Sequence, residues 1–327
     1  MIRQEILSLL AAHSGEFVSG EKMSEQFHLT RAAIWKHIQG LREAGYKIQS
    51  QTKSGYRLLE TPLRLEEWVM RAAMKSSRIG REIKVYEELG STNDFAKELV
   101  REGLGQDGMV ILAEKQIAGR GRQQRQWESP LGGLWMSLLI KPNLDLADAA
   151  KLTLSTGIAV ANVLNQEWGL DVKIKWPNDL IYQGKKLVGI LAEVVGEWNS
   201  VQTMIIGIGI NANFPAAQLG PDACAVSLQD ILGEQIDLNQ LVVEILKEME
   251  RELDFTEQQG FSTLPERWMD KAAGLGEEVE IVRQGEIIKG VMLGIALDGQ
   301  LQIDTGKEIA TFAAGEIKLR KSDKQYF

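Results

Sequence analysis

Hydrophobic positions in the first 60 residues repeat at the spacing of short helices and then alternate. Ile2, Ile6, Leu9 and Leu10 lie on one helical face, and a second short helix is expected over Val18–Phe27. A third follows after a short gap. The pattern predicts a compact helical head at the start of the chain.

The third expected helix, Arg31–Ala44, has recognisable ends and one apolar face. Thr30 is a residue type that caps helix N-termini, and Gly45 stands where a left-handed residue commonly ends a helix. The apolar face consists of three residues with helical spacing: Ile34, Ile38 and Leu41. Beyond this helix, Lys47–Leu58 alternates around the turn Thr52–Gly55, so a hairpin is expected. Three helices and a hairpin predict a winged helix-turn-helix.

The rest of the chain alternates between strand-like and helix-like segments and ends in short β segments. Expected strands are Met109–Glu114, Leu134–Ile140, Val172–Lys175, Leu187–Val195 and Met204–Ile210. Expected helices are Leu65–Met74, Asn93–Arg101, Ala147–Trp168 and Asn239–Gln258. After Gly274 come Glu278–Val282, Ile287–Ile295, Leu301–Asp304, Glu308–Phe312 and Ile317–Leu319. We therefore expect a multidomain α+β protein with a head over 1–62, a mixed α/β domain over 63–270 and a small β-barrel over 271–327.

Charge is distributed unevenly along this acidic chain of 327 residues and net charge −8. Residues 30–57 hold six basic residues against Glu43, so that segment is +5 and the remainder −13. A basic third helix favours DNA binding, and a protein-interaction head of the same fold is the alternative. The residues expected to meet DNA are Thr30, Arg31, Ala32, Trp35, Lys36, Lys53 and Arg57.

Histidine and cysteine usage restricts the chemistry of the larger domain. All three histidines lie within the first 40 residues, and Cys224 is the one cysteine. Histidine-assisted nucleophiles and the usual zinc sites are therefore excluded from the body. With no disulfide framework, no signal-peptide pattern and no apolar run long enough to span a bilayer, a cytoplasmic location is expected. Adenylyl or phosphoryl transfer suits an inventory of lysine, arginine, carboxylates and backbone groups.

The segment Gly119–Arg125, here called the Gly-Arg loop, is the first candidate site. It contains two glycines and three arginines, and it follows an expected strand. Glycine permits close approach of a ligand, and guanidinium groups suit a carboxylate or a phosphate. The alternative is a solvated basic loop, but an anion site is favoured because the surrounding chain is acidic.

Further candidate motifs follow this loop. Lys175–Asp179 closes a strand, and Asp179 could hold Mg²⁺ on a phosphate, although an ordinary turn has the same residue types. Lys186 enters a buried strand ahead of Gly189. The run from Gly207 formally matches a dinucleotide fingerprint, but Asn213-Phe214-Pro215 follows instead of a helix, so a Rossmann site is rejected.

In order and approximate spacing, these motifs resemble those of the bifunctional biotin–protein ligases that also repress biotin-synthesis genes. The matching runs are Ser91-Thr92-Asn93, Gln116 to Trp127, Lys175 to Asp179, Lys186 to Leu191 and Gly207 to Asn211. The resemblance covers essentially the whole chain. It implies a central domain of the biotin/lipoate ligase type and an SH3-like C-terminal barrel. One departure is Gln124, which stands where many members have glycine.

The resemblance also implies roles for individual residues. Biotin-binding positions would be Ser91, Thr92, Asn93, Gln116, Gly119, Arg120, Gly121, Arg122, Lys186 and Gly189. ATP or adenylate positions would be Arg125, Trp127, Asn178, Asp179 and Asn211. Lys186, Arg122 and Asp179 would act in catalysis, with Asp179 also the magnesium ligand.

The implied activity is transfer of biotin, through biotinyl-5′-adenylate, to a lysine of a biotin carboxyl carrier domain. Its substrates and cofactor would be biotin, ATP and Mg²⁺. Operator DNA would be bound by a homodimer that forms in the adenylate-bound state, and no membrane partner is expected. A lipoate-type ligase and a non-catalytic repressor that senses a small molecule remain the alternatives.

Overall fold

The computed structural model describes residues 2–13, 15–43, 45–60, 64–75, 77–141, 148–196, 203–220, 223–283, 286–313 and 315–319. The chain divides into two compact units, Met1–Arg64 and Leu65–Phe327. Among the described residues, no helix is both long enough and apolar enough to cross a membrane. The protein therefore consists of two compact units.

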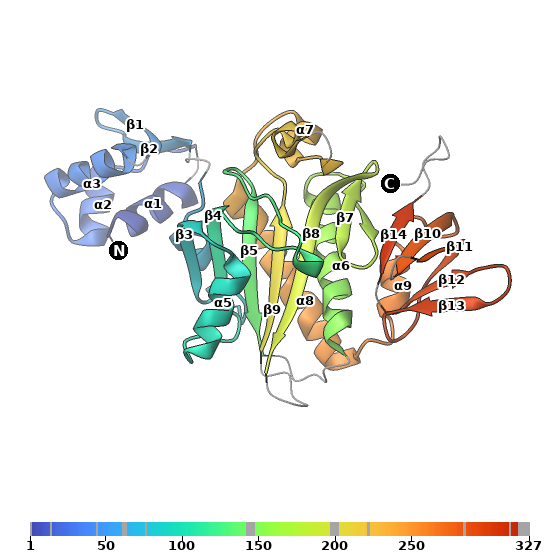
Figure 1. Ribbon diagram of the computed structural model, residues 1–327. Coiled ribbons are helices and arrows are strands. Elements are labelled where there is room, and N and C mark those ends of the chain that lie inside the picture. Colours follow the sequence, from blue (N-terminus) through green and yellow to red (C-terminus); the bar gives the residue numbers. More distant parts are fainter. Residues whose placement is uncertain are drawn as a thin grey trace. The chain divides into compact units, whose positions relative to one another are not determined.

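The first unit is a winged helix-turn-helix, as the sequence predicts (Figure 1). Its elements are α1 (Ile2–Ala12), α2 (Gly20–Phe27), α3 (Arg31–Glu43), β1 (Lys47–Gln51) and β2 (Gly55–Glu60). Ile6, Ile34 and Ile38 are fully buried between the helices. The expected cap is present, because Thr30 Oγ1 accepts a hydrogen bond from the Ala33 N–H at 3.2 Å.

The second unit is built on a seven-stranded sheet with the order β3-β4-β5-β9-β8-β7-β6. Its strands are β3 (Ile83–Leu89), β4 (Val110–Gln116), β5 (Leu134–Ile140), β6 (Lys173–Lys175), β7 (Asp179–Tyr182), β8 (Lys185–Val195) and β9 (Thr203–Ile210). Only β3 and β4 pair in parallel among these neighbours. A mixed α/β domain was expected and is confirmed.

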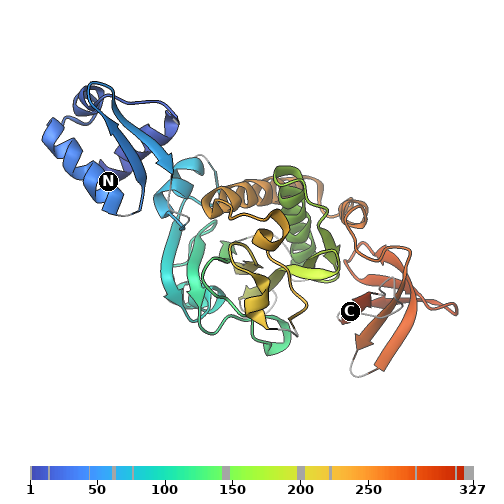
Figure 2. The same cartoon turned by 90° about the horizontal axis from the view of Figure 1, so that it is seen from above.

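Helices cover both faces of this sheet (Figures 1 and 2). They are α4 (Glu67–Ala73), α5 (Thr92–Arg101), α6 (Ala149–Glu167), α7 (Leu228–Leu232), α8 (Leu238–Gln259) and α9 (Leu264–Met269). The long helices α6 and α8 pack on one face, and α5 packs on the other, against β4, β5 and β9. Apolar side chains of β5, all buried, fill the space between these layers.

The C-terminal part is a five-stranded antiparallel sheet with the order β13-β12-β11-β10-β14. Its strands are β10 (Glu278–Arg283), β11 (Glu286–Ile295), β12 (Leu301–Asp304), β13 (Ile309–Phe312) and β14 (Glu316–Leu319). This arrangement is consistent with the expected small barrel. The indole N–H of Trp176 donates to the Gly299 carbonyl at 3.4 Å, so this sheet contacts the central domain. The boundary expected at 270/271 remains a prediction.

Candidate active site

One pocket opens on the face of the central sheet that carries α5. It is lined by the start of α5, the loop between β4 and β5, strands β8 and β9, the turn before β7 and two residues near β14. The predicted site residues that line it are Ser91, Thr92, Asn93, Gln116, Arg120, Gly121, Arg122, Arg125, Trp127, Asn178, Asp179, Lys186 and Gly189. The structure thus gathers motifs that lie far apart in the chain.

The Gly-Arg loop forms a short hairpin beside this pocket. The Gly121 N–H donates to the Arg125 carbonyl at 2.8 Å, and the Trp127 N–H donates to the Gly119 carbonyl at 2.9 Å. At its turn, Gln123 and Gln124 have φ values of +54° and +61°, in the left-handed region. Glycine adopts that region without a steric penalty, which explains why glycine suits the position of Gln124. The departure noted in the sequence therefore lies at the tip of the hairpin.

A chain of polar side chains lies at the start of α5. Ser91 caps the helix, and both the N–H and the hydroxyl of Thr92 donate to Gln116 Oε1, at 2.8 and 3.2 Å. Gln116 Nε2 in turn donates to Ser129 Oγ at 2.8 Å. Ser137 Oγ donates to Thr92 Oγ1 at 2.7 Å from beneath. This end of the pocket offers neutral donors and acceptors with fixed positions.

Sequence reasoning did not identify Ser129 or Ser137 as part of the site. Ser137 is fully buried and is the one polar residue in the otherwise apolar strand Leu134–Ile140. A lone hydroxyl in a buried strand needs a partner, so this break in the apolar run was the available signal. Ser129 had no comparable signal, because it lies in a polar loop.

The indole of Trp127 packs against two glycines, which together form the floor of the pocket. Gly189 of β8 and Gly209 of β9 are cross-strand partners. A Cβ atom at Gly189 would come within 2.8 Å of the indole, and one at Gly209 within 2.6 Å. The indole N–H is buried and has no hydrogen-bond partner among the described residues. The site therefore needs glycine at both positions, and it presents a donor that a ligand could satisfy.

Cationic groups form the other end of the pocket. The ammonium of Lys186 lies 2.8 Å from Asp179 Oδ1 and 4.8 Å from the centre of the Trp127 ring. Arg122 Nη1 donates to Asn178 Oδ1 at 3.1 Å, and Asn178 Nδ2 donates to the Ile190 carbonyl at 2.8 Å. Lysine, arginine and a carboxylate thus meet at the place where an anionic ligand would bind.

Two predicted site residues lie outside the pocket lining. Asn211 is 1% exposed, and its Nδ2 donates to the carbonyls of Lys186 and Val226 at 3.3 and 3.2 Å. It supports the backbone of Lys186 from behind. Gly119 packs so closely that a Cβ would come within 2.4 Å of the Trp127 carbonyl oxygen. Both positions shape the site without lining it. Strand β9 ends at Ile210 and no helix begins over residues 211–215, which agrees with the rejection of the dinucleotide fingerprint.

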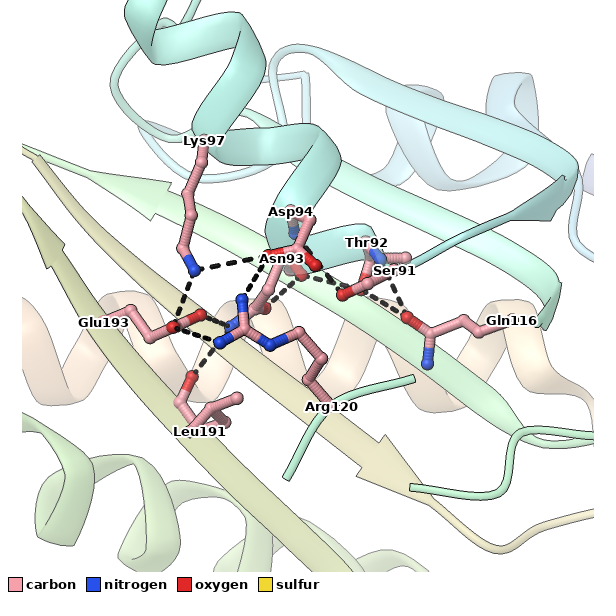
Figure 3. A network of polar contacts seen from close by, with 10 residues as sticks. Ser91, Thr92, Asn93, Asp94, Lys97, Gln116, Arg120, Leu191 and Glu193 are labelled. Carbon is pink, nitrogen blue, oxygen red and sulfur yellow. Dashed lines mark hydrogen bonds and ion pairs between the residues drawn. The ribbon is translucent and has the colours of Figure 1, made fainter. Parts of the chain in front are cut away.

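Three charged residues beside the pocket were absent from the sequence prediction. Asp94 of α5 and Glu193 of β8 contact the guanidinium of Arg120, and Lys97 of α5 pairs with both acids (Figure 3). Hydrogen bonding to Asp94 raises the pKa of Arg120 above its usual value. Arg120 therefore keeps its charge, and that charge is paired with acids of the protein.

The predicted DNA-contacting residues of the head differ in their surroundings. Trp35 is 56% exposed on α3, and Ala32 and Lys36 beside it are exposed. Arg31 pairs with Glu21 at 3.0 Å. Arg57 donates to Gln49 Oε1 at 2.6 Å and lies over the Phe17 ring, so it also fastens the wing to the helices.

Protein-family models match three parts of the chain. The Biotin/lipoate A/B protein ligase family matches residues 85–211, an HTH domain matches 2–57, and the Biotin protein ligase C terminal domain matches 274–320. The Bifunctional ligase/repressor BirA of Bacillus subtilis (strain 168) is 35% identical over 322 residues, which cover 97% of this chain and 98% of that protein. The chain belongs to the bifunctional biotin ligase/repressor family.

Other relatives agree with this membership. BirA of Escherichia coli (strain K12) is 33% identical over 98% of each chain. The structure of the biotin protein ligase from Aquifex aeolicus in complex with biotin and ATP has a TM-score of 0.65 and 30% identity, covering 74% of this chain and all of that one. The sequence assignment to this family is thereby confirmed.

Proposed function

We propose that this protein is an ATP-dependent biotin–protein ligase that also represses transcription in response to biotin. The observation that carries the proposal is the polarity of the pocket. Thr92 and Gln116 offer neutral hydrogen-bonding groups at one end, while Lys186 and Arg122 offer positive charge at the other. Biotin has the matching chemistry, with a neutral ureido ring and a carboxylate.

In the first step, the biotin carboxylate oxygen attacks the α-phosphorus of ATP and pyrophosphate leaves. Two anions must meet for this bond to form, so the site has to neutralise them. Lys186 and Arg122 both line the pocket, where Lys186 pairs with Asp179 and Arg122 donates to Asn178. Charge placed for a transition state typically contributes on the order of 3 kcal/mol, about a hundredfold in rate.

Mg²⁺ on the nucleotide fits the donors that the pocket provides. Asp179 is the one carboxylate among the residues that line it. The described residues contain no cluster of three potential metal ligands, so a cage made entirely of protein groups is absent from that part of the chain. Mg²⁺ typically takes one or two carboxylates and completes its shell with phosphates and water. Asp179 would hold the ion, which would neutralise charge on the phosphates.

In the second step, the amine of an acceptor lysine attacks the carbonyl carbon of the mixed anhydride. AMP leaves and the amine loses a proton to solvent. We infer that the acceptor is a biotin carboxyl carrier domain. Until it arrives, the intermediate needs protection from water, and the hairpin of the Gly-Arg loop, which lines the pocket, would cover the anhydride.

Incubation with ATP, labelled biotin and a carrier domain tests the activity. We expect label on the carrier that depends on ATP, and no transfer when lipoate replaces biotin. Transfer of lipoate at an equal rate would favour a lipoate-type ligase. Binding of biotin without adenylate formation or transfer would leave a non-catalytic repressor, and would contradict the proposal.

A further inference from the structure

The charged cluster beside the pocket joins three separate parts of the second unit. Asp94 and Lys97 belong to α5, Glu193 belongs to β8, and Arg120 belongs to the Gly-Arg loop. Figure 3 shows the guanidinium of Arg120 reaching from the loop to the carboxylates of the other two elements. Any force that holds Arg120 there also holds one strand of the hairpin.

Arg120 has two carboxylate partners. Its Nη1 donates to Asp94 Oδ1, and its Nη2 lies 3.7 Å from Glu193 Oε1. The side chains of Asp94 and Glu193 are 44% and 21% exposed, so the contacts lie at the edge of the solvent. Partial burial makes such pairs stronger than fully exposed ones, yet leaves them sensitive to salt.

Glu193 is held in place by partners other than Arg120. Its Oε1 accepts from Lys97 Nζ at 2.6 Å, and its Oε2 accepts from Asn93 Nδ2 at 2.9 Å. Asn93 is 4% exposed, and its amide also donates to the Leu191 carbonyl at 3.2 Å. The carboxylate that pairs with Arg120 is therefore already ordered by α5 and β8. Binding of Arg120 to it costs little additional side-chain entropy in those two elements.

We propose that Asp94 and Glu193 form a carboxylate clamp that grips Arg120 and keeps the hairpin over the pocket, so that the acyl-adenylate escapes slowly. Asp94 and Glu193 are positioning residues in this account, because they act on the ligand only through Arg120. Slow escape of the acyl-adenylate rests on the proposed ligase activity. Retention of the hairpin over the pocket rests on the geometry alone.

Asp94 also stabilises helix α5, and the test must separate that effect from its contact with Arg120. It lies in the first turn of α5, where a carboxylate stabilises a helix through the helix dipole. That effect is independent of Arg120, whereas the clamp requires it. A double-mutant cycle of Asp94→Asn and Arg120→Gln distinguishes the two. The exposed pair Lys115–Glu88, at 3.1 Å on strands β4 and β3, supplies a matched control through Glu88→Gln.

Tryptic cleavage of the ligand-free protein tests the clamp without requiring any activity. Trypsin cuts after Arg122 and Arg125 when the hairpin opens, and mass spectrometry follows each cut. We expect Asp94→Asn to raise the cleavage rate about threefold to tenfold, Glu88→Gln to leave it unchanged, and the double variant to match Arg120→Gln alone. Equal cleavage of Asp94→Asn and the unmutated protein would overturn the clamp.

Release of the intermediate tests the consequence. Protein loaded with labelled biotinyl-adenylate is mixed with excess unlabelled compound at low and high salt. We expect Asp94→Asn to release label about threefold to tenfold faster at low salt, with the difference shrinking at high salt, while biotin-dependent pyrophosphate exchange changes less than about twofold. Equal release overturns the proposal. Failure of the unmutated protein to make adenylate counts against the ligase, and the cleavage result still decides the clamp.

Discussion

Gly189 and Gly209 show how two missing side chains can shape a binding site. Both have extended backbone, so neither is glycine for the sake of a left-handed conformation. They are glycine because the Trp127 indole lies against them, at distances that leave no room for Cβ. The indole in turn forms the surface over which Lys186 is placed.

Replacing Gly209 with alanine should therefore displace Trp127. The added Cβ would lie 2.6 Å from the indole nitrogen, while the strand itself tolerates alanine. We expect biotin affinity, measured by calorimetry, to fall by about tenfold or more, with little change in melting temperature. Gly157→Ala in α6 is the control, because its Cβ would meet ordinary contacts at 3.6 Å or more. Unchanged biotin affinity in Gly209→Ala would contradict this role for the floor.

Motifs in the sequence predicted most of the residues that line the pocket, but not the carboxylate clamp. Lys186, Asp179 and the Gly-Arg loop have recognisable types and spacing. Asp94 and Glu193 lie on ordinary charged faces of a helix and a strand, and only the fold brings them to Arg120. A carboxylate that acts through a distant arginine leaves no local pattern.

Among the helices and strands, most segments expected from the sequence are present, but several elements were not predicted. The strands Leu134–Ile140 and Leu301–Asp304 have the bounds that the sequence predicted, and α8 differs by one residue at each end. The short helices α7 and α9 and the short strand β7 were not predicted. These three elements are four to six residues long and contain too few turns or alternations to be recognised by period alone, so tertiary packing decides their structure.

Glu252 of α8 pairs with Arg267 of α9 and has a pKa that differs from its usual value. Burial raises the pKa of Glu252, and two hydrogen bonds from Arg267, at 2.6 and 2.7 Å, oppose that shift only in part. The folded protein therefore binds this proton more tightly than the unfolded chain does. Its contribution to stability is present below the unfolded pKa of about 4.3 and is lost as the pH rises through the folded value.

We predict that Glu252→Gln makes the stability of the protein depend less on pH in this range. Melting temperatures measured from about pH 4 to pH 7 should fall less steeply with rising pH in the variant than in the unmutated protein. Glu308→Gln, which removes an exposed carboxyl, is the control. Parallel curves for Glu252→Gln and the unmutated protein would show that Glu252 does not titrate differently on folding.

Helix α3 presents an aromatic side chain to solvent beside its basic residues. Trp35 is 56% exposed, whereas Ile34 and Ile38 on the neighbouring face are fully buried. If the head binds DNA as proposed, Trp35 would contact base edges and Lys36 would contact the phosphates. These two kinds of contact have different effects on sequence preference.

We predict that Trp35→Ala lowers the preference for operator over scrambled DNA, by about tenfold in fluorescence anisotropy. Lys36→Ala should weaken binding to both duplexes alike and reduce the salt dependence. Lys307→Ala, in the C-terminal sheet, should change neither. An equal loss for both duplexes in Trp35→Ala would place Trp35 away from the bases.

At the scale of the whole molecule, charge separates the two activities. Residues 30–57 of the head carry +5, and the rest of the chain carries −13. An acidic body is repelled by nucleic acid, so binding is confined to the head. We propose that adenylate formation favours a homodimer, which presents two heads to an operator. Footprinting with and without biotin and ATP tests this coupling, and equal occupancy would contradict it.

On the proposed mechanism, Lys186 and Arg122 neutralise the two anions, a carboxylate and ATP, that must meet in this pocket. Biotin-dependent exchange of labelled pyrophosphate into ATP measures that step directly. We expect exchange by the unmutated protein and a loss of about a hundredfold in Lys186→Ala and in Arg122→Ala, with Glu88→Gln unaffected. Exchange at the unmutated rate in both Lys186→Ala and Arg122→Ala would contradict it.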